Sequence, residues 1–175
     1  MIQTPSDGET GVNRLIIAFL VFFSVFSSQI VLADTVGASG QALPRFVSLN
    51  TEKANMRSGP GRQYPILWTY KRRLLPLEIT AEHGAWRKVR DHEGVEGWIL
   101  VTLLYGPRTA LIRGRVRTLY RDDDMSSAAL LTAEPGVIGR ILTCTDIWCR
   151  LKVGDTKAWI EKRHVWGVYN NEILD

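Results

Sequence analysis

The feature of this sequence that most restricts its fold is an internal duplication. The string Gly84-Ala-Trp-Arg-Lys-Val89 aligns with Asp146-Ile-Trp-Cys-Arg-Leu151, and Glu96-Gly-Trp-Ile99 aligns with Lys157-Ala-Trp-Ile160. The matching tryptophans lie 62 and 61 residues apart. A repeat of about 60 residues is near the smallest unit that buries a core by itself, so the duplication predicts two small tandem domains.

Both copies consist of short strand-like runs separated by turns. Runs rich in β-branched and aromatic residues occupy 45–49, 66–70, 75–81, 85–90 and 95–100, and then 115–120, 129–131, 138–144, 148–153 and 157–161. Glycine-rich clusters such as Arg57-Ser-Gly-Pro-Gly61 separate the runs, and no long helical periodicity competes with them. The pattern predicts an all-β protein of two small closed barrels, with a boundary at 105–108.

The N-terminal region carries a targeting signal. Leu15–Phe26 has no charged residue, and Val31 and Ala33 fit the small-residue positions of a signal-peptidase site. We therefore expect 1–33 to be a helical signal peptide, cut before Asp34, and 34–44 to be a linker. An uncleaved anchor is the alternative, because 15–33 is 19 residues and a spanning helix needs about 20.

The basic residues are not shared equally between the two copies. Lys and Arg outnumber Asp and Glu by 12 to 6 in residues 45–113, whereas residues 114–175 hold 9 of each class. The first copy is therefore expected to attract polyanions such as acidic wall polymers or anionic lipid, and export makes nucleic acid an improbable partner. The alternative is that a basic pI only keeps the protein soluble.

The two cysteines, Cys144 and Cys149, are separated by four residues. In an exported chain this spacing favours a structural disulfide across paired strands, closing a short loop. A zinc site fails on ligand number, because the three histidines are scattered. A redox pair is more often spaced Cys-x-x-Cys.

Several motifs in order resemble the bacterial Src-homology-3-like domain family over residues 45–105. They are Asn55-Met-Arg-Ser-Gly-Pro-Gly61, Tyr64-Pro65, Leu77-Glu-Ile79, Gly84-Ala-Trp-Arg-Lys-Val89 and Gly97-Trp-Ile99. The second copy matches through Pro135-Gly-Val137, Trp148-Cys-Arg-Leu151 and Ala158-Trp-Ile160. The resemblance implies tandem domains at 45–107 and 108–170, each a five-stranded, partly open barrel. It also implies an extracytoplasmic location, binding to peptidoglycan or another envelope component, and no catalysis.

Strand alternation selects the candidate site residues. Trp86 and Val89 are three apart in one strand, so Trp86 points outward if Val89 is in the core, and Cys149 joins Leu151 on the core side. An indole face flanked by tyrosines and cations could hold a sugar ring and pair with a carboxylate of a peptide stem. The ligand-binding candidates are Trp86, Tyr64, Tyr70, Arg72 and Arg73. The alternative, favoured for Trp68 and Trp98, is that the aromatics fill a small core.

No motif in the sequence indicates catalysis, a metal or a cofactor. The acidic run 122–124 lacks the glycine and bidentate glutamate of a calcium loop, and no Ser or Cys triad context surrounds the histidines. We therefore expect a non-enzymatic periplasmic or envelope-associated module that recognises peptidoglycan through its basic first barrel. The alternative is a scaffold that docks another envelope protein, and a membrane partner is expected only through an uncleaved signal segment.

Overall fold

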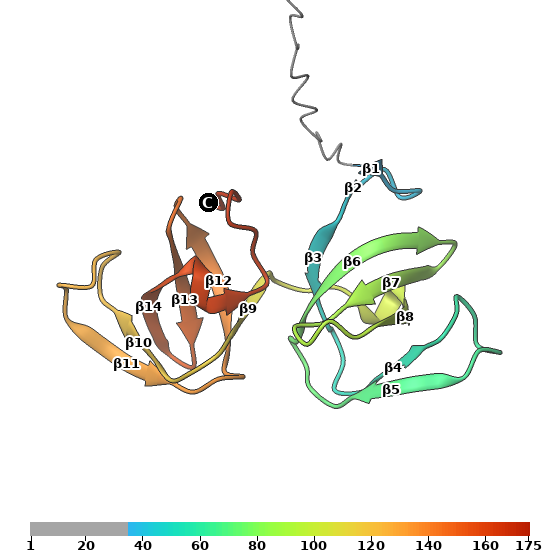
Figure 1. Cartoon of the computed structure of the whole chain (residues 1–175), viewed down its shortest axis with the longest axis horizontal. Coiled ribbons are helices and arrows are strands. Elements are labelled where there is room, and N and C mark those ends of the chain that lie inside the picture. Colours follow the sequence, from blue (N-terminus) through green and yellow to red (C-terminus); the bar gives the residue numbers. More distant parts are fainter. Residues whose placement is uncertain (1–34) are drawn as a thin grey trace, which may run out of the picture. The chain divides into compact units, whose positions relative to one another are not determined.

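The computed structural model describes residues 35–175, which belong to one compact unit, Ala33–Asp175 (Figure 1). The first half contains β1 (Thr35–Val36), β2 (Ala42–Leu43), β3 (Arg45–Ser48), β4 (Ala54–Arg57), β5 (Ile66–Tyr70), β6 (Pro76–His83), β7 (Trp86–Arg90), β8 (Glu96–Leu100) and the 3-10 segment η1 (Val101–Leu103). The second half contains β9 (Thr109–Ile112), β10 (Arg117–Tyr120), β11 (Ala129–Ala133), β12 (Ile138–Cys144), β13 (Trp148–Val153), β14 (Thr156–Glu161), η2 (Lys162–His164) and β15 (Val165–Trp166).

The prediction of an all-β protein is confirmed for this range, and the paired strands are antiparallel. Among residues 35–175, no helix has the length and apolar character that crossing a membrane requires. The predicted signal peptide, residues 1–33, lies outside the described residues.

The first domain is a six-stranded sheet in the order β3-β6-β7-β8-β4-β5. Its strands alternate, because Val89 of β7 and Ile99 of β8 are fully buried while Trp86 and Trp98 are only half-buried. The outward direction of Trp86 agrees with the prediction, whereas Trp98 was expected to fill the core. The core beneath these strands consists mainly of aliphatic side chains, among them Leu49, Met56, Leu77, Ile79, Val89 and Ile99.

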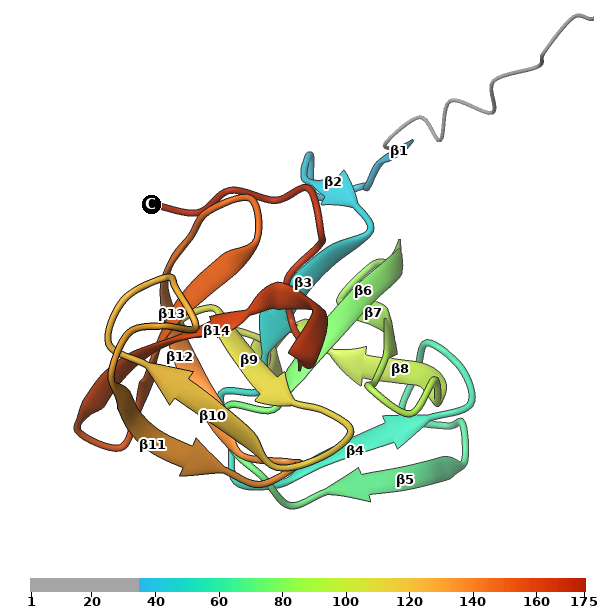
Figure 2. The same cartoon turned by 60° about the vertical axis from the view of Figure 1, so that its left-hand side comes forward.

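The second domain repeats this arrangement in a seven-stranded sheet, ordered β11-β10-β14-β13-β12-β9-β15 (Figure 2). Even an irregularity is repeated, since the pairing register shifts between Ile79 and Ala81 in β6 and between Ile141 and Thr143 in β12. Cys149 and Leu151 are both fully buried, as the alternation predicted. The duplication is therefore structural as well as sequential.

The two domains pack directly against each other. Leu111 of β9 belongs to the core of the first domain, and the Ser48 and Thr109 hydroxyls lie 2.7 Å apart. The ring of Phe46 contacts Trp166 and Tyr169, and the Tyr169 hydroxyl donates to Glu78 at 2.9 Å. Burial is the main cause that raises the pKa of Tyr169, and the hydrogen bond to Glu78 and the charge of Glu78 raise it further. The domains are thus held together by side-chain contacts as well as by the connecting chain.

The segment expected as a linker is ordered against the first domain from Thr35 onward. β1 and β2 form a hairpin, Leu43 is buried, and Ser39 binds Glu82 through both its backbone amide and its hydroxyl, each at 2.7 Å. The stretch from Thr35 to Pro44 is therefore a hairpin and a short connection that pack on the first domain. Its composition of small residues suits a tight hairpin on a domain surface equally well.

Candidate functional site

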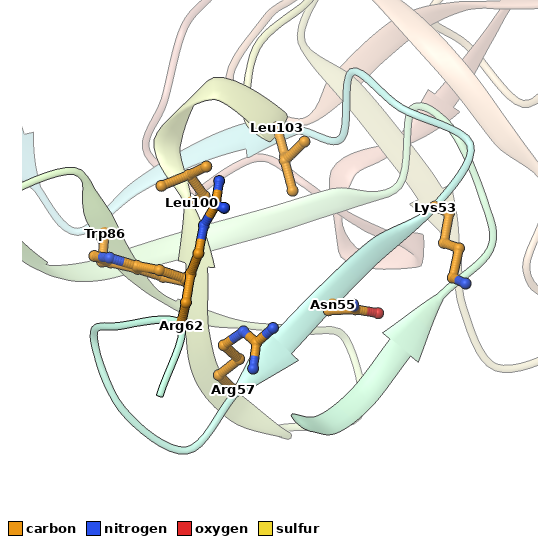
Figure 3. Close-up of a pocket in the computed structure, with 7 residues that line it drawn as sticks. All are labelled: Lys53, Asn55, Arg57, Arg62, Trp86, Leu100 and Leu103. Atoms are coloured by element: carbon orange, nitrogen blue, oxygen red, sulfur yellow. The ribbon is translucent and has the colours of Figure 1, made fainter. Parts of the chain in front are cut away.

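A cleft of about 420 Å³ opens on the outer face of the first domain. We call it the Trp86 cleft, and it is lined by Lys53, Asn55, Arg57, Arg62, Trp86, Leu100 and Leu103. In Figure 3 the side chain of Lys53, directly before β4, is followed by those of Asn55 and Arg57 on β4, and Trp86 and Leu100 stand on neighbouring strands. Trp86 and Leu100 face each other across the β7–β8 pair.

The period of the strands places these side chains on one face. In β4, Ala54 and Met56 are buried, so Asn55 and Arg57 turn to the opposite side. β4 approaches β8 closely because residue 97 is glycine. A Cβ at residue 97 would lie 2.9 Å from the Arg57 carbonyl oxygen. This distance is too short for a van der Waals contact, so any other residue would push the two strands apart.

The turn after β4 brings Arg62 to the cleft. It depends on Gly59, where a Cβ would lie 2.5 Å from the ring of Tyr64. Arg57 donates through its NH1 group to the Tyr64 carbonyl oxygen at 2.7 Å, and the Ser58 amide donates to the Pro65 carbonyl. The Gly-Pro-Gly string is therefore a turn that holds two arginines at the cleft.

The Trp86 cleft is cationic. No carboxylate lines it, and within residues 35–175 none of Lys53, Arg57 and Arg62 forms an ion pair. Guanidinium groups bind carboxylates and phosphates with charge-assisted hydrogen bonds. The arrangement can therefore hold an anionic group beside an indole.

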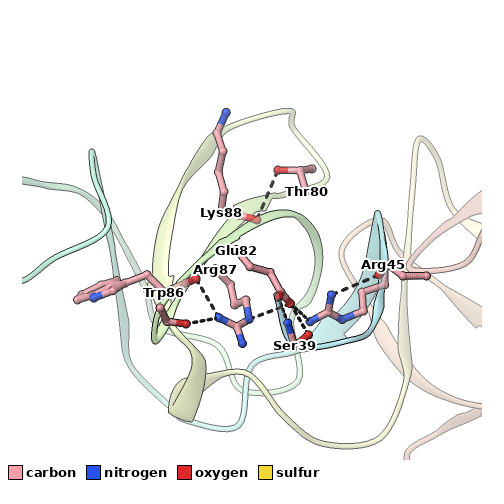
Figure 4. A network of polar contacts seen from close by, with 9 residues as sticks. Ser39, Arg45, Thr80, Glu82, Trp86, Arg87 and Lys88 are labelled. Carbon is pink, nitrogen blue, oxygen red and sulfur yellow. Dashed lines mark hydrogen bonds and ion pairs between the residues drawn. The ribbon is translucent and has the colours of Figure 1, made fainter. Parts of the chain in front are cut away.

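A polar network behind the cleft holds the strand pair that carries Trp86 (Figure 4). The side chain of Glu82 is 1% exposed, and its Oε1 lies 2.6 Å from Arg45 and 3.2 Å from Arg87. Arg87 also donates to the carbonyls of Gly84 and Trp86, at 2.8 and 3.0 Å. Burial acts to raise the pKa of Glu82, but hydrogen bonds from Ser39 and Arg45 outweigh it and lower the pKa to about 2.

Only part of the predicted site is assembled. Trp86 lines the cleft, as the alternation argument required. Tyr64 is exposed on the turn with its ring against Gly59, so it supports the cleft without lining it. Arg72 and Arg73 are exposed, and Arg72 lies in a separate depression with Trp68.

Tyr70 does not line the Trp86 cleft, and it lies at the separate depression that Trp68 and Arg72 also line. Tyr70 is only 6% exposed, and its hydroxyl donates to Asp91 at 2.8 Å. Burial, followed by the hydrogen bond to Asp91, raises the pKa of Tyr70. Tyr70 ends strand β5 on the core side, where a hydroxyl requires an internal partner.

The expectation that Trp68 fills the core is wrong, because this side chain is 56% exposed on β5. β5 ends the strand order of its sheet, so little of the domain covers it. Trp98 is half-buried, and its ring meets His83 edge-on at 6.4 Å.

Sequence reasoning missed the four polar residues that line the Trp86 cleft, Lys53, Asn55, Arg57 and Arg62. The signal was present. Residues 53, 55 and 57 have the same period of two that places Trp86 on the outer face, and Arg62 directly follows the predicted turn 57–61. The predicted strand runs leave out 54–56 and the predicted turn begins at Arg57, so the strand alternation of β4 does not enter the prediction.

The predicted disulfide is present, between Cys144 of β12 and Cys149 of β13. Within residues 35–175 no cluster of three His, Cys, Asp or Glu side chains is arranged to hold a metal ion. In the acidic turn, Asp124 accepts hydrogen bonds from the Ser126 amide and hydroxyl, and these lower its pKa.

Comparison with protein families matches this chain to the bacterial SH3 domain twice, over residues 50–106 and 117–167, more than half of the chain. These ranges lie inside the predicted limits of 45–107 and 108–170. No curated protein matches the chain.

Among solved structures, NlpC2 from Trichomonas vaginalis is 12% identical with a TM-score of 0.32, covering 70% of this chain and 48% of that one. A NlpC/P60 family protein from Bacillus cereus is 13% identical with a TM-score of 0.33, covering 69% of this chain and 55% of that one. The chain thus spans about half the length of these structures.

Proposed function

The chain belongs to the bacterial SH3 domain family, in two copies, and from this premise we propose that it is a non-enzymatic module of the cell envelope. It is exported and binds peptidoglycan or another anionic wall component through the Trp86 cleft of the first domain. Each sheet closes into a small, partly open barrel, and the cleft lies on the outside of the first one.

One observation carries this proposal: an outward-facing indole lies in a cleft with three cations that no carboxylate neutralises. An indole presents a large apolar face suited to a sugar ring. The cations Lys53, Arg57 and Arg62 supply charge-assisted hydrogen bonds for carboxylates of a peptide stem. A polymer with both groups fits the cleft better than either group alone.

The residues that line the cleft argue against binding of a proline-rich peptide and against hydrolysis. A proline-rich peptide groove needs further aromatic walls, but here Leu100 and Leu103 occupy that side. Hydrolysis needs a positioned nucleophile or acid–base pair, and the lining residues are Lys, Asn, Arg, Trp and Leu. Binding without catalysis is the simplest use of this set.

Sedimentation with purified sacculi tests the proposal. The unaltered protein is expected to pellet with the sacculi, whereas Trp86→Ala and Arg62→Gln each lower retention about tenfold because they remove the indole wall or a cation. Arg72→Gln is the matched control, since Arg72 is an exposed cation of the same domain outside the Trp86 cleft.

Three results of this assay would contradict the proposal. If the unaltered protein stays in the supernatant, the module does not bind the wall. If Arg72→Gln lowers retention as much as Arg62→Gln, binding is not located at the Trp86 cleft. Release of soluble fragments from the sacculi would show that the chain is an enzyme.

A protein-docking scaffold is the second candidate, and the edge of the first sheet favours it. Residues 62–68 are all exposed, and they include the apolar run Tyr64-Pro-Ile-Leu-Trp68. Contiguous exposed apolar residues on an edge strand are typical of protein interfaces. A scaffold would stay in the supernatant with sacculi, and Leu67→Thr would abolish recovery of an envelope protein that the unaltered chain retains.

A further inference from the structure

The second domain has a cleft at the place equivalent to the Trp86 cleft. Its volume is also about 420 Å³. Trp148 stands where the first domain has Trp86, while Val116, Tyr120 and Met125 replace Lys53, Arg57 and Arg62. Each of these residues lies 62 or 63 positions after its counterpart. We call this the Trp148 cleft.

The three replaced cations leave an aromatic and apolar wall. The rings of Tyr120 and Trp148 meet edge-on, with centroids 6.1 Å apart and planes at 87°. Val116 and Met125 are both more than half exposed beside them. Such a wall suits a flat ring or another apolar body, because it buries that body without requiring specific hydrogen bonds.

Three arginines line this cleft, and two of them, Arg115 and Arg117, are not neutralised by any residue of 35–175. Within residues 35–175, Arg115 and Arg117 form no ion pair and donate no side-chain hydrogen bond, and the Nε of Arg117 is buried without a partner. A buried donor that lacks an acceptor destabilises the protein. An acceptor supplied by a ligand would remove this destabilisation.

The single carboxylate of the cleft is already engaged. Oε2 of Glu161 accepts from Arg163 at 2.8 Å and lies 3.1 Å from Nε2 of His164. Burial, followed by the charge of Arg117, lowers the pKa of His164, so the imidazole is mainly neutral at neutral pH. Arg115 and Arg117 therefore remain the available charges.

We propose that the Trp148 cleft is a second anion-binding site. Arg115 and Arg117 bind a carboxylate or phosphate group, and Tyr120 and Trp148 contact the ring or apolar body that carries it. The site is independent of the Trp86 cleft, and the zero net charge of residues 114–175 conceals it because most of the acidic residues lie elsewhere.

The test is an NMR titration of the purified protein with three oligomers of equal length. Oligogalacturonate carries a carboxylate on each pyranose ring, polyphosphate carries phosphate without a ring, and maltohexaose carries rings without charge. The indole signal of Trp148 and the guanidinium signal of Arg117 report on this cleft, and the indole of Trp86 reports on the other.

The proposal predicts that oligogalacturonate shifts the Trp148 and Arg117 signals, and that Arg117→Gln weakens this binding about tenfold. Within residues 35–175 Arg117 forms no ion pair and donates no side-chain hydrogen bond, so Arg117→Gln is expected to keep the fold. Arg121→Gln is the matched control, because this exposed arginine pairs with Asp122 and does not line the cleft. A response to polyphosphate as well would assign the site to phosphate-bearing as well as carboxylate-bearing polymers.

Two outcomes would overturn the proposal. Equal binding of maltohexaose, unaffected by Arg117→Gln, would make the cleft a neutral sugar site. Shifts confined to Trp86 would show that the second domain binds no anion. Conversely, Trp148 shifts with an unresponsive Trp86 would support this site while contradicting the proposed function of the first domain, so the two failures are distinguishable.

Discussion

The two domains differ in the interaction that links the strand pair carrying the cleft tryptophan. Glu82 pairs with Arg87 across β6 and β7, and Cys144 pairs with Cys149 across β12 and β13, at positions 62 residues apart. The first pair is an ion pair and the second is a disulfide. In each domain the pair lies directly beside the tryptophan that forms the cleft wall. The strand pair carrying this tryptophan is cross-linked in both domains, by charge in one and by a covalent bond in the other.

The surroundings of the two cross-links are also related. A terminal segment packs on the same strand in both domains. The β1–β2 hairpin binds Glu82 through Ser39, and Leu174, near the C-terminus, exchanges two backbone hydrogen bonds with Cys144, at 2.7 and 3.1 Å. Ser39 supplies a hydroxyl and an amide donor that a carboxylate can use, whereas Leu174 supplies backbone hydrogen bonds and an apolar side chain that packs on the core. An ion network suits the first case and a compact disulfide suits the second.

The largest expected effect is that of Glu82→Gln. It removes the only carboxylate of the network and leaves the guanidinium groups of Arg45 and Arg87 uncompensated in a nearly buried site. We expect a loss of about 3 kcal/mol in the free energy of unfolding, measured with urea. Glu96→Gln is the control, because its pair with Lys88 is exposed and should cost less than about 1 kcal/mol. Equal midpoints for Glu82→Gln and the unaltered protein would show that the network is not a cross-link.

Removing the disulfide is expected to cost somewhat less. Cys144→Ala combined with Cys149→Ala keeps both positions apolar, so the main loss is the constraint on a short loop, about 2 kcal/mol. Urea unfolding measures it, and a reductant should lower the midpoint of the unaltered protein to that of the double variant. If the reductant changes nothing, the second domain does not depend on the bond.

Much of the fold could be predicted from the sequence because it rests on alternation and duplication. The runs 66–70, 138–144 and 148–153 coincide with β5, β12 and β13. β4 was missed because Ala-Asn-Met-Arg has little β-branched or aromatic character, and it is a strand only because Met56 is buried against the sheet. Pairing across the chain overrides local propensity there.

The candidate site was harder to predict from the sequence than the fold, because it depends on which residues from different strands lie close together. The outward direction of Trp86 could be predicted from strand alternation. The burial of Tyr70 and the separation of Arg72 from the Trp86 cleft could not be predicted from the neighbouring sequence. Net charge was also a poor guide to the second domain, since Arg115 and Arg117 of this neutral half form no ion pair with any residue of 35–175. Which charges meet is decided by the tertiary structure.

A third prediction uses pH to separate the two cross-links. The pKa of Glu82 is lowered from 4.5 to about 2, so its stabilisation is complete above about pH 5 and is lost as the pH falls toward 2. A disulfide has no such titration. The loss of unfolding free energy caused by Glu82→Gln should therefore be smaller at about pH 3 than at about pH 6, by on the order of 1 kcal/mol. Urea unfolding of both proteins at the two pH values checks this, and a penalty unchanged by pH would contradict the charge-based account.

The smallest expected effect concerns charges on the outer face of the same strands. Arg90 lies opposite Glu96 in the first domain, whereas the equivalent positions of the second hold Lys152 opposite Lys157. Like charges directly across a strand pair destabilise it, so Lys157→Glu should stabilise the protein by about 0.5 kcal/mol. The gain should appear in urea unfolding at low salt and diminish as salt is added, because both side chains are solvated. A gain that salt does not reduce would mean that the substitution acts through packing, and the like-charge pair would then be irrelevant to the difference between the domains.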